Sequence, residues 1–154
     1  MARKTGSATP LWRFLFLVYC GVMLWLLFYR SHSWDSKVPY RELLRHNSNF
    51  APLHTITDYW FMLWHSKDSY MRSHCFINLT GNVLLFVPAG WLLPKLWKRQ
   101  RNFFRFLVTS FFALLLVETT QLFSLLGRFD VDDLILNVIG MTVGFLLFFI
   151  FRKK

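Results

Sequence analysis

Polar side chains that could perform chemistry recur inside segments of the chain that are otherwise apolar. Ionisable and amide groups are costly in such surroundings, so each one needs a partner or a function. The amide side chains are Asn78, Asn82, Gln121 and Asn137, and Glu118 is a carboxyl group among them. A separate charged cluster contains Arg128, Asp130, Asp132 and Asp133. We take these residues as the candidate site.

Two kinds of chemistry are open to this set. In a binding protein, Arg128 would meet the phosphate or carboxylate of a ligand, and the amides would orient the rest of the molecule. In an enzyme, Glu118 would be the general acid or base, and Asp130, Asp132 and Asp133 would hold a divalent cation. Carboxylate oxygens suit Mg²⁺, Mn²⁺ or Ca²⁺. In a purely structural alternative, the amides hydrogen-bond between helices and Arg128 pairs with an aspartate.

The histidines do not indicate a hydrolase of the Ser-His type. All of them fall in one polar stretch between the first two apolar segments, and no nucleophile-elbow motif lies near them. They are His32, His46, His54, His65 and His74.

Composition defines the surroundings of these residues. Of 154 residues, 55% are apolar, 19% are aromatic and only 17% are charged, and the net charge is +10. A small soluble domain carries about 25% charged residues. The basic residues punctuate long apolar runs instead of covering one face, which is typical of a membrane protein and not of a nucleic-acid binder. We therefore expect a bilayer, and no nucleic acid, as the partner.

Four apolar segments are long enough to cross a bilayer as helices. About 20 residues, each rising about 1.5 Å, span a hydrocarbon core of about 30 Å. The segments are 11–29, 77–97, 103–126 and 131–151. They predict an all-α fold, a polytopic bundle of four transmembrane helices. The corner 127–130 is so short that the last two helices must be antiparallel neighbours.

The basic residues predict the orientation, because short cytoplasmic loops are rich in Lys and Arg. In this chain, the basic residues gather before the first segment, around the loop 98–102 and in the tail 152–154. These residues are Arg3, Lys4, Lys95, Lys98, Arg99, Arg101, Arg105, Arg152, Lys153 and Lys154. We expect residues 1–10, the loop 98–102 and the tail to be cytoplasmic. The loop 30–76 and the corner 127–130 are then extracellular.

Part of the long outer loop has helical periodicity. Apolar residues recur at Leu53, Ile56, Trp60, Leu63 and Trp64 among polar ones. This spacing predicts an amphipathic segment on the outer membrane surface, with its aromatic rings at headgroup level. The alternative is an irregular aromatic-rich loop packed on the bundle.

The polar residues of the last three segments share faces and depth. Asn78 and Asn82 lie on one stripe of a helix, and Asp133 and Asn137 on another that also contains a GxxxG pair, Gly140 and Gly144. Counted from the outer ends, the side chains in this layer lie roughly 7 to 13 Å deep, namely Asn82, Gln121, Asn137 and Glu118. We therefore predict a polar pocket in the outer leaflet. The residues expected around its single cavity are Asn82, Glu118, Gln121, Arg128, Asp133 and Asn137.

The order and spacing of these motifs resemble the VanZ-like family. The resemblance rests on Asn78-Leu-Thr-Gly-Asn82-Val-Leu-Leu-Phe-Val-Pro88-Ala-Gly90-Trp-Leu-Leu-Pro94, on Glu118-Thr-Thr-Gln121, on Arg128-Phe-Asp130-Val-Asp132-Asp133, and on Asn137-Val-Ile-Gly140 with Gly144. Asn49-Phe-Ala-Pro52-Leu-His-Thr-Ile56 is similar to the motif that precedes them. The resemblance covers about residues 49–151, but the stretch 55–75 shows no family pattern.

The resemblance implies a bacterial protein of the cytoplasmic membrane with four or five helices. The family is named for a member that lowers susceptibility to teicoplanin, a glycopeptide with a lipid tail that acts on cell-wall precursors at the outer membrane face. The expected ligand is accordingly a lipid-linked or amphiphilic molecule, either a cell-envelope precursor or such an antibiotic. The alternative is an intramembrane enzyme that modifies a lipid-linked substrate.

Overall fold

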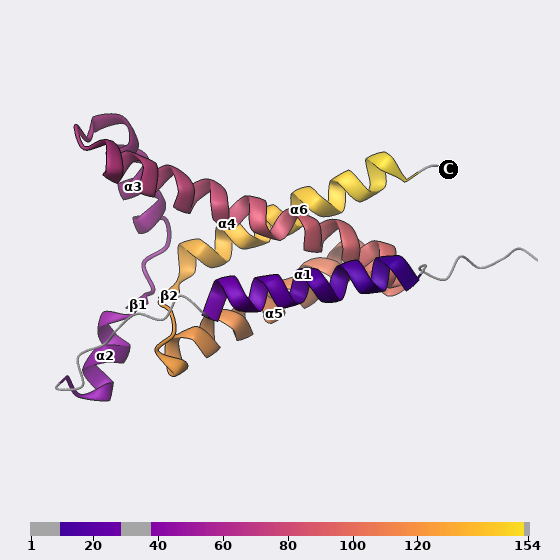
Figure 1. The fold of residues 1–154 in the computed structure, drawn as a ribbon, viewed down its shortest axis with the longest axis horizontal. Coiled ribbons are helices and arrows are strands. Elements are labelled where there is room, and N and C mark those ends of the chain that lie inside the picture. The colour runs from indigo at the N-terminus through magenta and orange to yellow at the C-terminus, as the bar shows by residue number, and fades with distance from the viewer. Residues whose placement is uncertain (1–9, 29–37, 153–154) are drawn as a thin grey trace, which may run out of the picture.

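The chain folds as a bundle of long helices with a cap of short elements at one end (Figure 1). The computed structural model describes residues 10–28 and 38–152. In order, the elements are α1 (Pro10–Phe28), α2 (Tyr40–His46), β1 (Ser48–Asn49), α3 (His54–His65), α4 (Ser69–Leu96), the 3₁₀ helix η1 (Lys98–Arg101), α5 (Phe103–Ser124), β2 (Phe129–Asp130) and α6 (Val131–Phe151). The predicted all-α class is confirmed. Arg3, Lys4, His32 and the last two lysines lie outside the described residues.

Four helices, α1, α4, α5 and α6, are long and apolar enough to cross a membrane. Three of them begin and end within two residues of the predicted segments. Helix α4 instead begins at Ser69, not at residue 77, and has 28 residues. At about 1.5 Å per residue it is about 42 Å long, which exceeds a hydrocarbon core of about 30 Å. Its first turns are polar, so hydropathy alone did not indicate them.

Side-chain caps explain where three of the long helices begin. Asp68 accepts a hydrogen bond from the backbone of Tyr70 at the start of α4. Asn102 does the same for Arg105 at the start of α5, and Asp130 for the backbone at the start of α6. Such caps satisfy backbone N–H groups that have no partner inside the helix. The Asn102 cap therefore fixes the position at which η1 ends and α5 begins.

Helices α4 and α6 form the centre of the bundle and run in the same direction (Figure 1). A Cβ atom on Gly140 would collide with the Val83 carbonyl, and one on Gly144 would collide with the carbonyl of Val87. From the other side, Gly90 lies against the backbone of Met141. The glycines therefore permit backbone contact between the helices, as the GxxxG pattern predicted.

Helix α1 is held on α4 at the end near the chain's C-terminus. The Lys95 ammonium lies 3.3 Å from the ring centroid of Trp12 and 3.9 Å from that of Trp91. The two indole rings meet edge to face, 5.1 Å apart. A cation between two such rings attracts both through their quadrupoles. This arrangement fixes the first turns of α1 against the bundle.

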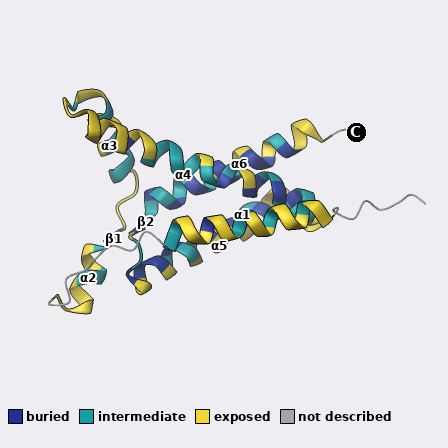
Figure 2. Ribbon diagram, in the orientation of Figure 1, coloured by how far each residue is buried: buried dark blue, intermediate teal, exposed yellow. Residues whose placement is uncertain are grey.

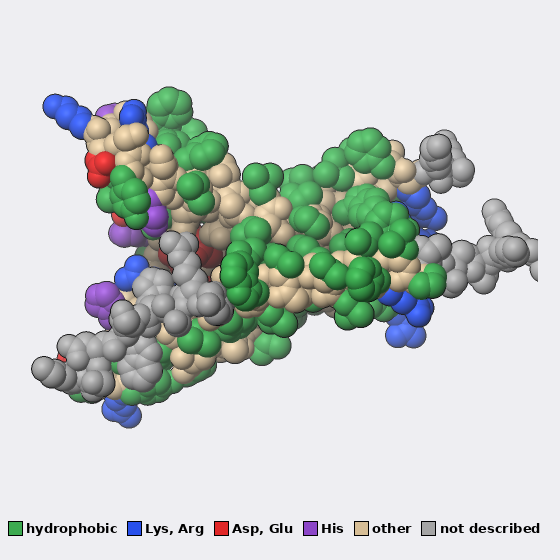
Figure 3. Space-filling model, viewed as in Figure 1, with side chains coloured by type: hydrophobic (Ala, Val, Ile, Leu, Met, Phe, Trp, Pro, Cys, Tyr) green, Lys and Arg blue, Asp and Glu red, His purple; other side chains and the backbone are tan. Residues whose placement is uncertain are grey.

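The outer faces of the long helices are apolar and exposed (Figures 2 and 3). Leu17, Leu116 and Ile150 are among the large apolar side chains that remain mostly exposed. Soluble monomers rarely expose contiguous apolar surface of this extent. In Figure 3, Lys and Arg lie at the two ends of the molecule, and Asp, Glu and His gather at the end that contains α2 and α3. The apolar belt between the ends suits a bilayer.

The capping elements at that end include the predicted amphipathic helix, now α3. Its Trp60 and Trp64 are exposed, and their rings contact each other at 5.9 Å. The sequence did not predict α2 or the two short strands. Strand β1 pairs in parallel with β2, with Ser48 opposite Phe129 and Asn49 opposite Asp130. Through this pairing the long outer loop is attached to the corner between α5 and α6.

Candidate functional site

The paired strands create a network of hydrogen bonds around Asp130. The Asn49 amide donates to the Asp130 carboxylate at 3.3 Å and to the Thr55 hydroxyl at 2.9 Å. The Thr55 hydroxyl in turn donates to the same carboxylate oxygen at 2.7 Å. The other oxygen of Asp130 caps α6. One oxygen of Asp130 thus fixes the corner against Asn49 and Thr55, and the other fixes the start of α6.

Asp132 fixes the beginning of α3. Its carboxylate accepts hydrogen bonds from the backbone N–H groups of Leu53, at 2.5 Å, and of Ile56, at 3.0 Å. Leu53 precedes the helix and has no side chain that could cap it. A carboxylate is favoured at a helix N-terminus, where unpaired N–H groups and the helix dipole are both positive. Asp132 is fully buried, and its role here is structural.

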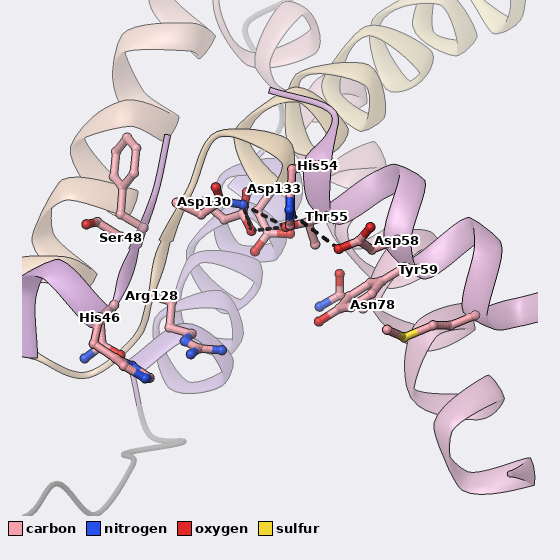
Figure 4. A pocket seen from close by; sticks show the side chains of 14 residues that line it. His46, Ser48, His54, Thr55, Asp58, Tyr59, Asn78, Arg128, Asp130 and Asp133 are labelled. Carbon is pink, nitrogen blue, oxygen red and sulfur yellow. Dashed lines mark hydrogen bonds and ion pairs between the residues drawn. The ribbon is translucent and has the colours of Figure 1, made fainter. Parts of the chain in front are cut away.

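A cavity of about 350 Å³ lies beside this network, between α2, α3, α4 and the corner (Figure 4). It is lined by His46, Asn47, Ser48, Asn49, His54, Thr55, Asp58, Tyr59, Met62, Asn78, Arg128, Phe129, Asp130 and Asp133. In Figure 4, Arg128 and His46 lie on one side and Asp58, Tyr59 and Asn78 on the other. Most of the residues that line the cavity have polar or charged side chains.

The charges around the cavity are not equally compensated. The carboxylates of Asp130 and Asp133 accept hydrogen bonds, and Asp58 lies 3.4 Å from the His54 ring. Arg128 is exposed, and within the described residues it forms no ion pair. An unpaired guanidinium offers a fork of donors that fits a phosphate or carboxylate. The carboxylates opposite can accept hydrogen bonds from hydroxyl or ammonium groups.

Two neutral groups complete the wall opposite Arg128. Burial raises the pKa of the Tyr59 phenol, and the nearby Asp133 carboxylate raises it further, so Tyr59 remains a neutral hydrogen-bond donor. The Asn78 side-chain oxygen is buried and has no hydrogen-bond partner among residues 10–28 and 38–152. A buried polar atom without a partner is costly, and a ligand or water that donates to it would remove that cost.

Beneath the cavity, the polar faces of α4, α5 and α6 meet. The Asn82 amide donates to the Asp133 carboxylate. The Asn137 amide donates to Glu118 at 3.5 Å, the upper limit for a hydrogen bond. Glu118 is only 4% exposed, and in the described part of the chain its second oxygen has no hydrogen-bond partner. The three helices therefore turn their polar faces to a common centre, as their spacing predicted.

The prediction that one cavity is surrounded by all six residues is wrong. Of the six, only Arg128 and Asp133 line the polar cavity. Asn82, Glu118 and Asn137 pair with polar neighbours and fill the layer beneath it. Gln121 turns to α1 and donates to the Leu27 carbonyl at 2.9 Å. Because Glu118 does not line the cavity, it gains no support as a general acid or base.

The predicted carboxylate site for a divalent cation is also not formed. Asp130 accepts from the Thr55 hydroxyl, Asp132 accepts from the backbone at the start of α3, and Asp133 turns instead to Asn82 of α4. Across the described residues, no group of three or more His, Cys, Asp or Glu side chains is placed to hold a metal ion. The residues adjoin in sequence but diverge because the first turn of a helix separates successive side chains by about 100°.

Sequence reasoning missed the wall of the cavity supplied by residues 46–62. The motif from Asn49 to Ile56 indicated this segment, but it did not show that Asn49 and Thr55 would contact Asp130. Predicted binding residues Asn78, Arg128, Asp130 and Asp133 do line the cavity. The signal that would have located the rest is the two-residue strand pairing, which has no periodicity to detect.

Four membrane-length apolar helices around a buried polar layer define the class, a polytopic α-helical membrane protein. Residues 16–152 match the family model described as VanZ/LLP1. The chain belongs to the VanZ/LLP1 family. No curated protein and no solved structure matches it.

Proposed function

We propose that this protein binds the headgroup of a lipid-linked or amphiphilic molecule in the cavity beside Arg128. Membership of the VanZ/LLP1 family links it to glycopeptide susceptibility. In this proposal, the bound molecule is a cell-envelope precursor or a lipid-tailed glycopeptide such as teicoplanin. Occupancy of the cavity then influences how strongly the antibiotic acts at the outer face of the membrane.

The observation that carries the proposal is the mixed character of the cavity. Arg128 supplies an uncompensated cation, and across from it Asp133, Tyr59 and Asn78 supply acceptors and a donor. Such a site favours a headgroup with an anionic group at one end and hydroxyl or amino groups at the other. Glycosyl phosphates and peptides with a free carboxylate have this pattern. A volume of about 350 Å³ lies in the range of small-molecule sites, roughly 300–1,000 Å³.

The location of the cavity favours an amphiphile over a soluble ligand. Its lining includes Asn78 of α4 and Asp133 in the first turn of α6, next to the apolar part of the bundle. A lipid headgroup occupies this depth, and the concentration of lipids in the bilayer reduces the affinity that a site needs. Arg128 at the interface can remain partly hydrated until a phosphate replaces its water.

We further propose that the cavity faces the outside of the cell. Helices α1 and α5 run opposite to α4 and α6 (Figure 1), so the beginning of α1, the end of α6 and η1 belong to the same end of the bundle. That end carries Lys98, Arg99 and Arg101, and the positive-inside rule assigns it to the cytoplasm of a bacterial cell.

A reporter inserted after Lys98 tests this orientation. We expect a cytoplasmically active reporter such as green fluorescent protein to be active there and a periplasmic phosphatase to be inactive. The same pair of reporters after Ser66, between α3 and α4, should give the opposite result. Phosphatase activity at Lys98 would place the cavity on the cytoplasmic side and remove the role in an outer-leaflet encounter.

Replacing Arg128 with glutamine tests the binding function. The variant loses the charge-assisted hydrogen bonds to an anionic headgroup, each worth about 1.5 to 3 kcal/mol. We therefore expect anionic amphiphile retained by the purified protein, measured by mass spectrometry, to fall by about tenfold or more. Any reduction in teicoplanin susceptibility that the protein confers should be lost in parallel.

Arg72→Gln is the matched control, because Arg72 is an exposed arginine at the same end of the molecule, outside the polar cavity. We expect it to leave lipid retention and susceptibility unchanged. Membrane abundance and the thermal midpoint should be alike in both variants and the unmodified protein. Equal retention by Arg128→Gln and the unmodified protein would refute the headgroup site.

A further inference from the structure

A second hollow, which we call the lateral groove, runs along α4 from the outer end into the apolar belt. It has a volume of about 400 Å³ and is lined by Tyr70, Ser73, His74, Ile77, Asn78, Gly81, Asn82 and Leu85. From Asn78 to Leu85 it extends about 10 Å along the helix axis. This part lies within the apolar span of α4, so the groove adjoins the hydrocarbon region of the bilayer.

The course of α1 explains why this face of α4 is open. The Tyr19 hydroxyl donates to the Leu85 carbonyl at 2.8 Å, so α1 and α4 are in contact at the inner end of the groove. Further along α1, the Leu27 carbonyl accepts from Gln121 of α5. Helix α1 therefore passes from α4 to α5 as it approaches the outer end. The α4 face between His74 and Leu85 is left without α1 packed on it.

The floor of the groove is unusually free of side chains at Gly81. A Cβ atom on Gly81 would have nothing within 4 Å, in contrast to Gly140 or Gly144, which lie against backbone. Helix-to-helix packing therefore does not require glycine here. Its effect is to deepen the groove between Ile77 and Leu85, both of which are apolar.

The groove and the polar cavity meet at Asn78, which lines both. The two hollows differ in charge, because no described Lys, Arg, Asp or Glu side chain lines the groove, although part of its lining is polar. One contains Arg128 and carboxylates, and the other presents Ile77, Gly81 and Leu85 at membrane depth. The unpartnered oxygen of Asn78 lies at the junction, where a lipid carries its ester or first polar linkage.

We propose that the lateral groove holds the hydrocarbon chain of the molecule whose headgroup occupies the polar cavity. This inference rests on the headgroup site proposed above. The ligand then enters sideways from the outer leaflet, with its chain already in the bilayer, and the headgroup moves past Asn78 to Arg128. The site recognises a single-chain or polyprenyl-type amphiphile as a whole, and a soluble headgroup alone gains only part of the contacts.

Photolabelling with a chain-modified lipid tests this placement. The probe is a hexadecyl phosphate with a diazirine in its chain, incorporated in nanodiscs with the full-length protein. We expect label on α4 between Ile77 and Leu85, located by peptide mass spectrometry. Excess unlabelled hexadecyl phosphate should prevent this labelling, and hexadecanol, which lacks the anionic group, should not. Labelling of the exposed faces of α1 and α5 by bulk lipid should respond to neither.

Gly81→Leu fills the groove, and Gly21→Leu is its matched control. Both glycines lie in membrane-length helices, and a Cβ atom added to either would have nothing within 4 Å, but Gly21 does not line the groove. We expect Gly81→Leu to abolish the competable label on α4, Gly81→Ala to reduce it, and Gly21→Leu to leave it unchanged. All three should retain the thermal midpoint of the unmodified protein.

The outcomes separate this inference from the headgroup site. Competable labelling of α4 that persists in Gly81→Leu, or labelling that hexadecanol prevents as well as the phosphate does, would overturn the groove. In that case, the headgroup site still stands without the groove if Arg128→Gln makes hexadecyl phosphate and hexadecanol compete equally for the label. If Arg128→Gln leaves that distinction intact, the headgroup site itself is wrong and the groove proposal falls with it.

Discussion

Replacing Gly140 with valine is expected to separate α4 from α6 and to abolish stable accumulation of the protein. Even the Cβ atom would collide with the Val83 carbonyl, which belongs to the backbone of a membrane helix and has no freedom to move aside. Overpacking against flexible side chains costs about 1 to 3 kcal/mol, and against rigid backbone we expect more than about 3 kcal/mol. Membrane abundance and the midpoint of thermal unfolding in detergent measure the effect.

Gly21→Val controls for the introduction of a β-branched residue into a membrane helix. Gly21 has open space around it, so we expect the midpoint to remain near that of the unmodified protein. Gly144→Val should behave like Gly140→Val, because Gly144 also lies against the backbone of α4, at Val87 and Gly90. Equal stability of Gly140→Val and Gly21→Val would show that α4 and α6 are not in backbone contact.

Asp132→Ala is expected to release α3 from the bundle. The substitution leaves the backbone N–H groups of Leu53 and Ile56 without their acceptor. It also removes a fully buried carboxylate from the N-terminus of α3. Hydrogen bonds to charged groups contribute about 1.5 to 3 kcal/mol each, so we expect a loss of about 3 kcal/mol. Cys75 reports the change, because it is fully buried close to Tyr59 of α3.

The experiment measures the rate at which a maleimide labels Cys75 in a Cys20→Ser background. We expect labelling to be at least about a hundredfold faster in Asp132→Ala, in line with an opening free energy lower by about 3 kcal/mol. Asp68→Ala is the control, since Asp68 caps α4 from an exposed position and should cost about 1 kcal/mol. Unchanged labelling in Asp132→Ala would mean that α3 is held by its other contacts.

The sequence predicted the features of this fold that depend on local periodicity. Apolar length located the four membrane-length helices, and the spacing of Asn82, Glu118 and Asn137 correctly predicted that the polar faces of three helices meet at one centre. The GxxxG pair correctly indicated close helix packing. These predictions succeed because a residue's position on a helix follows from its number alone, given about 100° per residue.

The features that failed depend on contacts between segments far apart in the chain. Asp132 was a candidate metal ligand, but a helix more than seventy residues away in sequence provides its hydrogen-bond donors. Gln121 was placed at the shared centre, but α1 supplies its partner from 94 residues away. The outer wall of the cavity depends on β1 and β2, which have two residues each. No periodic pattern encodes such pairings.

The attachment of the outer cap to α6 has a consequence for the order of assembly during synthesis. Residues 48–56 emerge from the ribosome well before their partners at 129–132. Contacts of such high sequence separation form late in folding. The beginning of α3 must therefore remain uncapped until α6 has inserted. Until then, the aromatic residues of α3 can lie on the lipid surface. A chain that terminates before α6 would contain three of the four apolar helices and would lack both Asp133 of the cavity lining and the Asp132 carboxylate at the start of α3, so the cavity described here can form only after α6 has been made.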